Sequence, residues 1–137
     1  MTKQTCIHER NIALQKIYER ILKSQVNRNL LSNDAIVSVI IEQPAPRFYI
    51  TPGHAKEIIH AFKSKDYKRC NLRSKLRQEM AEDLVANFDR LCKQFPHTPK
   101  EKIYEMVVEQ PAKLFYVTHR VARDIIFNYT GRNGKRK

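Results

Sequence analysis

The chain has 137 residues, of which 42% are hydrophobic, and it carries 26 Lys and Arg against 14 Asp and Glu. This length suits one ordinary domain or two very small ones, and a count of three glycines favours helices over a β-sandwich or barrel. The net charge of +12 indicates an anionic partner, most often nucleic acid, with simple solubility as the competing explanation. No apolar run approaches the roughly 18 residues of a membrane span, and the polar N-terminus has no apolar signal segment, so we expect a cytoplasmic protein without a membrane partner.

The first predicted elements are two helices. Apolar side chains recur at helical spacing within residues 9–24, which predicts an amphipathic helix. A second helix is expected from about Asp34 to Gln43, with Ser32 or Asn33 as its N-cap. The same segment is rich in β-branched residues, so a strand is the alternative for it.

A duplicated stretch resolves this ambiguity in favour of a helix. Residues 36–62 (the first copy) align without a gap to residues 103–129 (the second copy), and eleven of the 27 pairs are identical. Thr98 and Glu101 form a predicted capping box around Pro99 just before the second copy, which indicates the start of a helix. Both copies are therefore expected to begin with a helix.

Each copy continues through a proline-stopped segment into a further helix. Pro44 and Pro111 are expected to end the helices before them. The aromatic pair that follows favours a loop or a one-bridge strand, and pairing between the two copies is an alternative. Thr51 and Thr118 are good N-caps for the next helix. We expect the first aromatic residue of each pair to fill the core and the second to keep its hydroxyl at the rim; the pairs are Phe48-Tyr49 and Phe115-Tyr116.

The segment between the copies is strongly basic. Residues 63–77 carry seven Lys or Arg against one acid, Asp66. A long amphipathic helix is predicted from about Asn71 to Lys93, and its pattern matches that of residues 9–24. Each repeat thus contains three predicted helices.

The predicted fold is all-α, with two tandem trihelical repeats packed as one pseudo-symmetric domain. The repeats are expected at residues 1–66 and 67–131, followed by a basic tail at 132–137. A trihelical unit whose second and third helices are joined by a fixed turn resembles the helix-turn-helix DNA-binding superfamily, although the turn here is longer than usual and contains no glycine. The resemblance implies that the third helix enters a major groove and reads base edges.

Positive charge is concentrated where this resemblance needs it. Residues 63–78 and residues 111–137 each carry seven basic residues against one acid. Such clustering is typical of phosphate binding, because neutralised phosphates release their counterions. The predicted nucleic-acid-binding residues lie on the third helices, in the basic segment, in the tail and at one linker position: Lys56, Lys63, His119, Arg120, Arg123, Asn128, Lys65, Lys68, Arg69, Arg73, Arg132, Lys135, Arg136 and Arg47.

The sequence offers no pattern for catalysis. Its histidines and three cysteines fall in no metal-ligand spacing, and we expect the thiols to be reduced. A Gly-rich phosphate loop and a nucleophile elbow are absent, so neither an enzyme, a metal nor a cofactor is expected. The predicted function is non-enzymatic binding of double-stranded DNA, as in a small regulator or accessory factor of a bacterial mobile element or prophage, a context that rests on analogy. The alternatives are a protein-interaction module and an RNA-binding protein that uses the basic segment.

Overall fold

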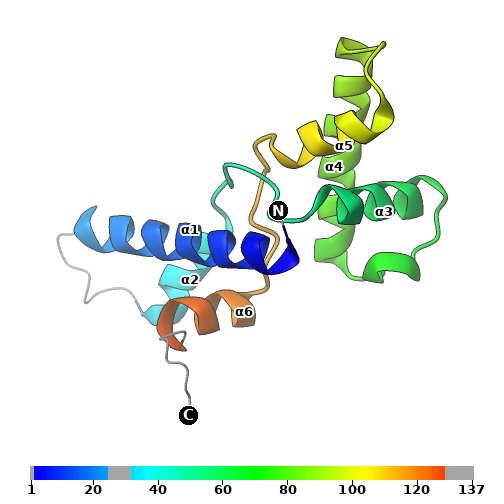
Figure 1. The fold of residues 1–137 in the computed structure, drawn as a ribbon. Helices are drawn as coiled ribbons and strands as arrows, with labels where there is room; N and C mark the ends of the chain where they lie inside the picture. Colours follow the sequence, from blue (N-terminus) through cyan, green and yellow to red (C-terminus); the bar gives the residue numbers. More distant parts are fainter. Residues whose placement is uncertain (1, 25–31, 129–137) are drawn as a thin grey trace.

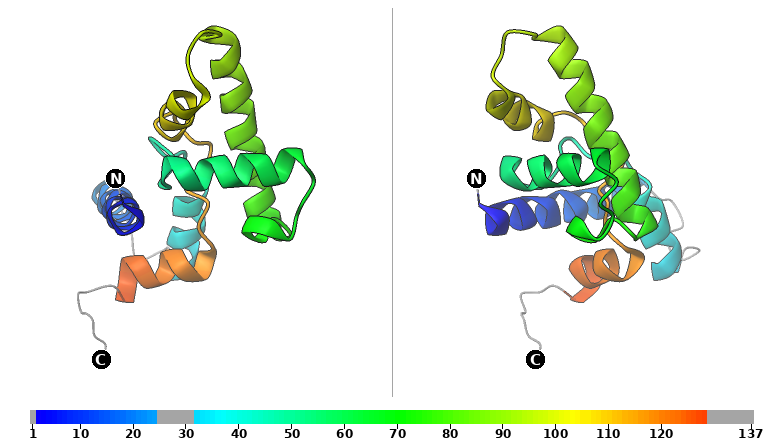
Figure 2. Two further views of the ribbon diagram at one scale, coloured as in Figure 1. Left: turned by 45° about the vertical axis from the view of Figure 1, so that its right-hand side comes forward. Right: turned by 90° about the vertical axis from the view of Figure 1, so that its right-hand side faces the viewer.

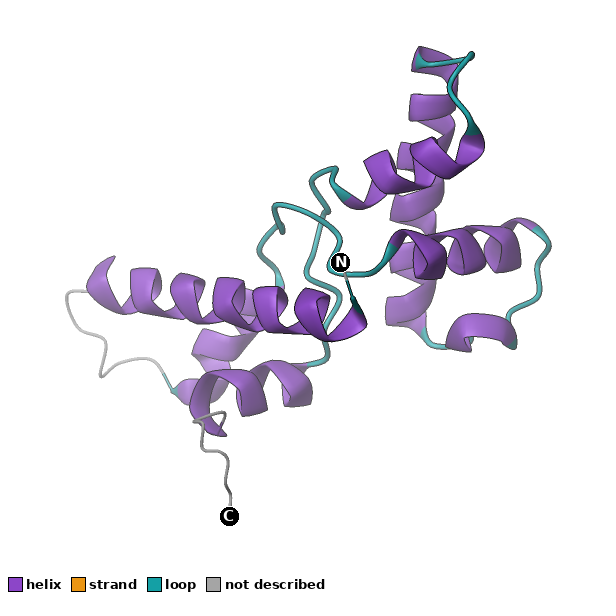
Figure 3. Ribbon diagram, in the orientation of Figure 1, coloured by secondary structure: helices purple, strands orange, loops and turns teal. Residues whose placement is uncertain are grey.

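The structure is a computed structural model that describes residues 2–24 and 32–128, and it is all-helical there apart from one isolated β-bridge (Figure 1, Figure 3). No helix in these ranges is long and apolar enough to cross a membrane. The elements, in chain order, are α1 (Lys3–Ser24), α2 (Asn33–Ile41), α3 (Pro52–Lys63), the short 3₁₀ helix η2 (Arg69–Asn71), α4 (Lys75–Gln94), α5 (Lys100–Val108), α6 (His119–Arg123) and the π-helical turn η3 (Asp124–Asn128).

Side-chain caps start α2, α3 and α6 where the sequence predicts them. The hydroxyl of Ser32 accepts from Ala35 N at 3.1 Å, and the hydroxyls of Thr51 and Thr118 cap α3 and α6 in the same way. The predicted capping box before α5 is wrong. Pro99 itself occupies the N-cap position, with no side-chain cap, and α5 begins one residue later than expected.

The two copies exchange helices, because the last helix of each copy packs with helices of the other repeat. α3, from the first copy, packs against α4 and α5, whereas α6 and η3, from the second copy, pack against α2 and α1. Figures 1 and 2 show the resulting first lobe (α1, α2, α6 and η3) and second lobe (α3, α4 and α5), with two linkers crossing between them. Packing therefore follows a grouping different from the predicted repeats 1–66 and 67–131, in which three consecutive helices would pack together.

The two linkers, residues 42–51 and residues 109–118, meet where they cross. Ala45 and Ala112 form the isolated antiparallel bridge, with both N–H···O distances at 3.0 Å. The aromatic rings then stack reciprocally: Phe48 on Tyr116 at 6.3 Å between centroids, and Tyr49 on Phe115 at 5.9 Å. Pairing between the copies, predicted as an alternative, thus occurs at the alanines, and equivalent residues of the two copies contact one another.

Burial of the linker aromatics agrees with the sequence at the phenylalanines but not at one tyrosine. Phe48 and Phe115 are buried and join the apolar core that runs through both lobes. The hydroxyl of Tyr116 was expected at the rim; instead it donates to Asp83 Oδ2 at 2.7 Å. Burial and the neighbouring Asp83 carboxylate raise the pKa of Tyr116 far above its usual range.

Asp83 fastens the second linker to α4. Its side chain is buried and accepts from the Tyr116 hydroxyl, from Lys113 N at 2.9 Å and from Asn87 Nδ2 at 3.1 Å. A buried carboxylate is tolerated when several donors satisfy it, and removal of the acceptor would leave these part-buried donors without that partner. Tyr116 itself takes a left-handed backbone conformation (φ 59°), which this contact helps to hold.

The exchange predicts a specific chemical cross-link between α3 and α5, which belong to different predicted repeats. A carbodiimide should join Lys56 to Glu101, whose Nζ and Oε2 lie 3.0 Å apart, within the monomer. Peptide mapping after proteolysis would detect the link, and the local pair Lys102–Glu105 serves as a positive control for the reaction. Formation of the local link without the Lys56–Glu101 link would contradict the exchanged packing.

Replacing the buried carboxylate should destabilise the fold. We expect Asp83→Ala to lower the free energy of unfolding by about 2–4 kcal/mol, because Tyr116 and Lys113 lose their acceptor. The adjacent acid Glu82 is exposed, so Glu82→Ala should change stability by less than about 0.5 kcal/mol. Urea denaturation of both variants measures the two changes in the free energy of unfolding. Equal changes would contradict the anchoring role of Asp83.

Candidate nucleic-acid interface

The lysines of α3 form ion pairs with the helices against which α3 packs. Lys56 pairs with Glu101 of α5 at 3.0 Å, and the hydrogen bond to this carboxylate raises the pKa of Lys56. Lys63 pairs with Asp89 of α4 at 2.8 Å and lies 5.0 Å from the centre of the Phe88 ring. These predicted nucleic-acid contacts therefore lie at the contact between α3 and the rest of the second lobe.

A similar arrangement holds α6 against α2. Arg123 lies 3.5 Å from the Asp34 carboxylate, and His119 Nε2 lies 3.3 Å from the Asp34 carbonyl oxygen. Arg120 is exposed and forms no ion pair with a described residue. Asn128 is the last described residue of η3, and its side chain lies outside the described part of the structure, as do the tail residues Arg132, Lys135 and Arg136.

Exposed ion pairs of this kind contribute little stability. Each of these pairs joins elements from different predicted repeats, and the cation of each pair is one that the sequence predicts to contact nucleic acid. A base or phosphate would compete with these carboxylates for Lys56, Lys63 and Arg123. Of the predicted third-helix cations whose side chains are described, Arg120 is the one left without an ion pair there.

The connector between α3 and α4, residues 64–74, has a well-defined backbone. Asp66 N donates to Ala61 O at 2.9 Å and Lys65 N donates to Phe62 O at 3.1 Å, the two bonds of a Schellman ending of α3. Lys65 takes the left-handed conformation (φ 61°) that glycine usually supplies there. At the other end, Leu72 is fully buried in the core, and Ser74 Oγ caps α4.

The connector presents its cations to solvent. Lys65, Lys68, Arg69 and Arg73 are all exposed, as is Lys75 at the start of α4. None of them forms an ion pair with a residue that the structure describes. The four connector cations were predicted from sequence. The sequence did not single out Tyr67, an exposed aromatic residue in their midst that packs on Phe62 at 6.1 Å between ring centres.

The connector and α6 lie at the same end of the molecule, although they belong to different lobes. In the views of Figures 1 and 2, η2 and α6 both occupy the lower end, on either side of the crossing linkers.

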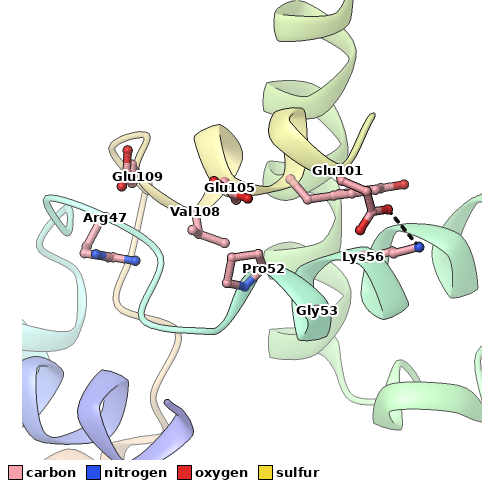
Figure 4. A pocket seen from close by; sticks show the side chains of 9 residues that line it. Arg47, Pro52, Gly53, Lys56, Glu101, Glu105, Val108 and Glu109 are labelled. Carbon is pink, nitrogen blue, oxygen red and sulfur yellow. Dashed lines mark hydrogen bonds and ion pairs between the residues drawn. The ribbon is translucent and has the colours of Figure 1, made fainter. Parts of the chain in front are cut away.

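Arg47 lies elsewhere, beside a hollow of mixed charge. Figure 4 shows this hollow of about 400 Å³ between the start of α3 and α5, where Arg47 and Lys56 are accompanied by Glu101, Glu105 and Glu109. Arg47 Nε donates to the carbonyl of Phe48 at 3.2 Å. The two carboxylates of α5 and that of Glu109 at its C-cap make this hollow a poor environment for a phosphate.

The described residues include no cluster of three or more side chains that could hold a metal ion. The cysteines Cys6, Cys70 and Cys92 are free thiols. Comparisons of the chain with protein-family models, with curated proteins and with solved structures each find no match. Function is therefore inferred from the charges and the geometry of the chain itself.

Proposed function

We propose that this protein binds double-stranded DNA without catalysing a reaction, and that the connector makes the principal contact. Lys65, Lys68, Arg69 and Arg73 would neutralise backbone phosphates, with Arg120 of α6 as an additional contact. On this proposal, the helical units resemble those of helix-turn-helix proteins, but the connector and not the third helix makes the main contact with DNA.

The observation that carries the proposal is the set of exposed connector cations that have no ion-pair partner in the described chain. Phosphate contacts depend on available cations at fixed positions, because each contact releases a condensed counterion. The Schellman ending at Lys65 and the buried Leu72 fix the connector at both ends, so little conformational entropy is lost when it binds.

We further propose that the two copies form one pseudo-symmetric domain that presents two related lobes to the same duplex. Support comes from the reciprocal stacking of Phe48 on Tyr116 and of Tyr49 on Phe115, together with the bridge between Ala45 and Ala112.

Neutralising the connector should weaken DNA binding and reduce its salt dependence. We expect Lys68→Gln/Arg69→Gln/Arg73→Gln to lower duplex affinity about tenfold or more, and to reduce the salt slope by roughly one unit for each cation that no longer neutralises a phosphate. Fluorescence anisotropy with a blunt, 5′-hydroxyl duplex at several salt concentrations measures both quantities.

A matched control removes the same charge elsewhere. Lys16, Arg20 and Lys23 are exposed on α1, and their triple replacement by Gln should leave most of the affinity intact. Equal losses in the two triple variants would contradict a localised interface. The double variant Arg120→Ala/Arg123→Ala, measured in parallel, tests the contribution of α6. A duplex affinity within about twofold of the unaltered protein would show that α6 is not part of the interface.

Binding of single-stranded or hairpin RNA is the second candidate, and Tyr67 is the specific reason for it. An exposed aromatic residue among cations can stack on an unpaired base, a contact worth about 1–3 kcal/mol. We expect Tyr67→Ala to leave duplex binding unchanged if DNA is the ligand. A loss of affinity for a hairpin RNA, with tighter binding of that RNA than of the duplex by the unaltered protein, would instead support the second candidate.

A further inference from the structure

A second hollow, distinct from that of Figure 4, is lined by basic groups from three helices. It has a volume of about 260 Å³, and its basic lining residues are Lys3 and Arg10 of α1, His54 of α3 and Arg77 of α4. Tyr49 and Ile50 of the first linker form part of its wall. Figures 1 and 2 show how it arises: the N-terminal turns of α1 and α3 lie side by side.

The described residues that line this hollow include no acid. The guanidinium of Arg10 uses two of its nitrogens on Asn11 Oδ1, at 3.2 and 3.1 Å, and retains further donors. Arg77 forms no ion pair with a described residue. Burial lowers the pKa of Arg10, which is a sign that this cation is held partly out of water.

His54 adds an unpaired polar atom. Its Nε2 is buried and has no hydrogen-bond partner among the described residues, whereas most buried polar atoms in proteins are paired. Burial of the ring is the largest cause of the lowered pKa of His54, and the positive charges of Arg77 and Lys3 lower this pKa further. The negative charge of Glu57 acts in the opposite direction. An anion in the hollow would supply the missing partner and would favour the protonated ring.

The duplication provides an internal comparison. Tyr49 and Tyr116 are equivalent residues of the two copies, and each borders a hollow. The hollow beside Tyr116, of about 360 Å³, is lined by the acids Glu79, Glu82 and Asp83 together with Lys113. The predominance of basic groups beside Tyr49 is therefore not a necessary result of the crossing linkers.

From this geometry we infer that the hollow formed by Arg10, His54 and Arg77 binds a phosphomonoester group. Arginine guanidinium groups match tetrahedral oxyanions with paired donors, and a dianion balances more of the local charge than a chloride or a carboxylate does. The apolar wall of Tyr49 and Ile50 fits the organic part of such a ligand.

The phosphomonoester could be a small metabolite or the 5′-terminal phosphate of a nucleic acid. This inference deepens the proposed function only in the second case, and it stands without that function in the first. The duplex used to test DNA binding has 5′-hydroxyl ends, so the result of that assay does not depend on the hollow.

The test titrates the full-length protein with inorganic phosphate and, at equal ionic strength, with chloride. Histidine-selective ¹H–¹⁵N spectra follow His54, and calorimetry gives the dissociation constant. We expect saturable shifts at His54 with phosphate but not with chloride. Arg77→Gln should weaken phosphate binding about tenfold or more, whereas Arg20→Gln, the same change on the exposed surface of α1, should leave it unaltered.

Equal responses to the two anions, or equal effects of Arg77→Gln and Arg20→Gln, would overturn the inference. If Arg77→Gln disturbs the fold, His54→Gln tests the same site, with calorimetry as the readout. AMP against adenosine, and a 5′-phosphorylated against a 5′-hydroxyl hexanucleotide, then identify the source of the group. Failure of both phosphorylated ligands to bind better than their unphosphorylated forms would also contradict a phosphomonoester site.

Discussion

The structure depends on the crossing of two linkers at Ala45 and Ala112. The crossing delivers α3 to the second lobe and α6 to the first, so neither lobe has a complete set of helices without it. Each linker contains a proline three residues after the end of its helix, and the ring stacks that follow the bridge bury aromatic surface on both sides. Asp83 then fixes the second linker to α4 by accepting from the Lys113 amide and the Tyr116 hydroxyl.

This constraint changes the role of the charged residues on the third helices. Lys56, Lys63 and Arg123 form ion pairs with the helices against which α3 and α6 pack. Their positive charge is largely balanced by these partners. The connector, in contrast, carries exposed cations that form no ion pair with a described residue, and its backbone is held at Lys65 and Leu72.

Local features of the fold were predictable from the sequence, whereas the exchange was not. The caps at Ser32, Thr51 and Thr118 follow from short-range hydrogen bonding, which the sequence encodes directly. The exchanged and unexchanged packings bury the same apolar faces, because the copies share their core residues, so periodicity cannot distinguish them. Sequence also could not place Tyr116, since its partner Asp83 lies in a separate helix and comes close through the fold alone.

The basic hollow follows from the same crossing. His54 lies on α3 and Arg77 on α4, and they line one hollow because the first linker delivers α3 to α4 while passing the N-terminal end of α1. Three helices that are separate in the sequence thus line one basic hollow, and no sequence motif indicates that they come together. Tyr116, the equivalent of Tyr49 in the second copy, instead borders a hollow lined by Glu79, Glu82 and Asp83 of α4 and by Lys113. The two copies therefore share their packing residues, while the side chains that neighbouring helices contribute give the surroundings of the two linkers different charge.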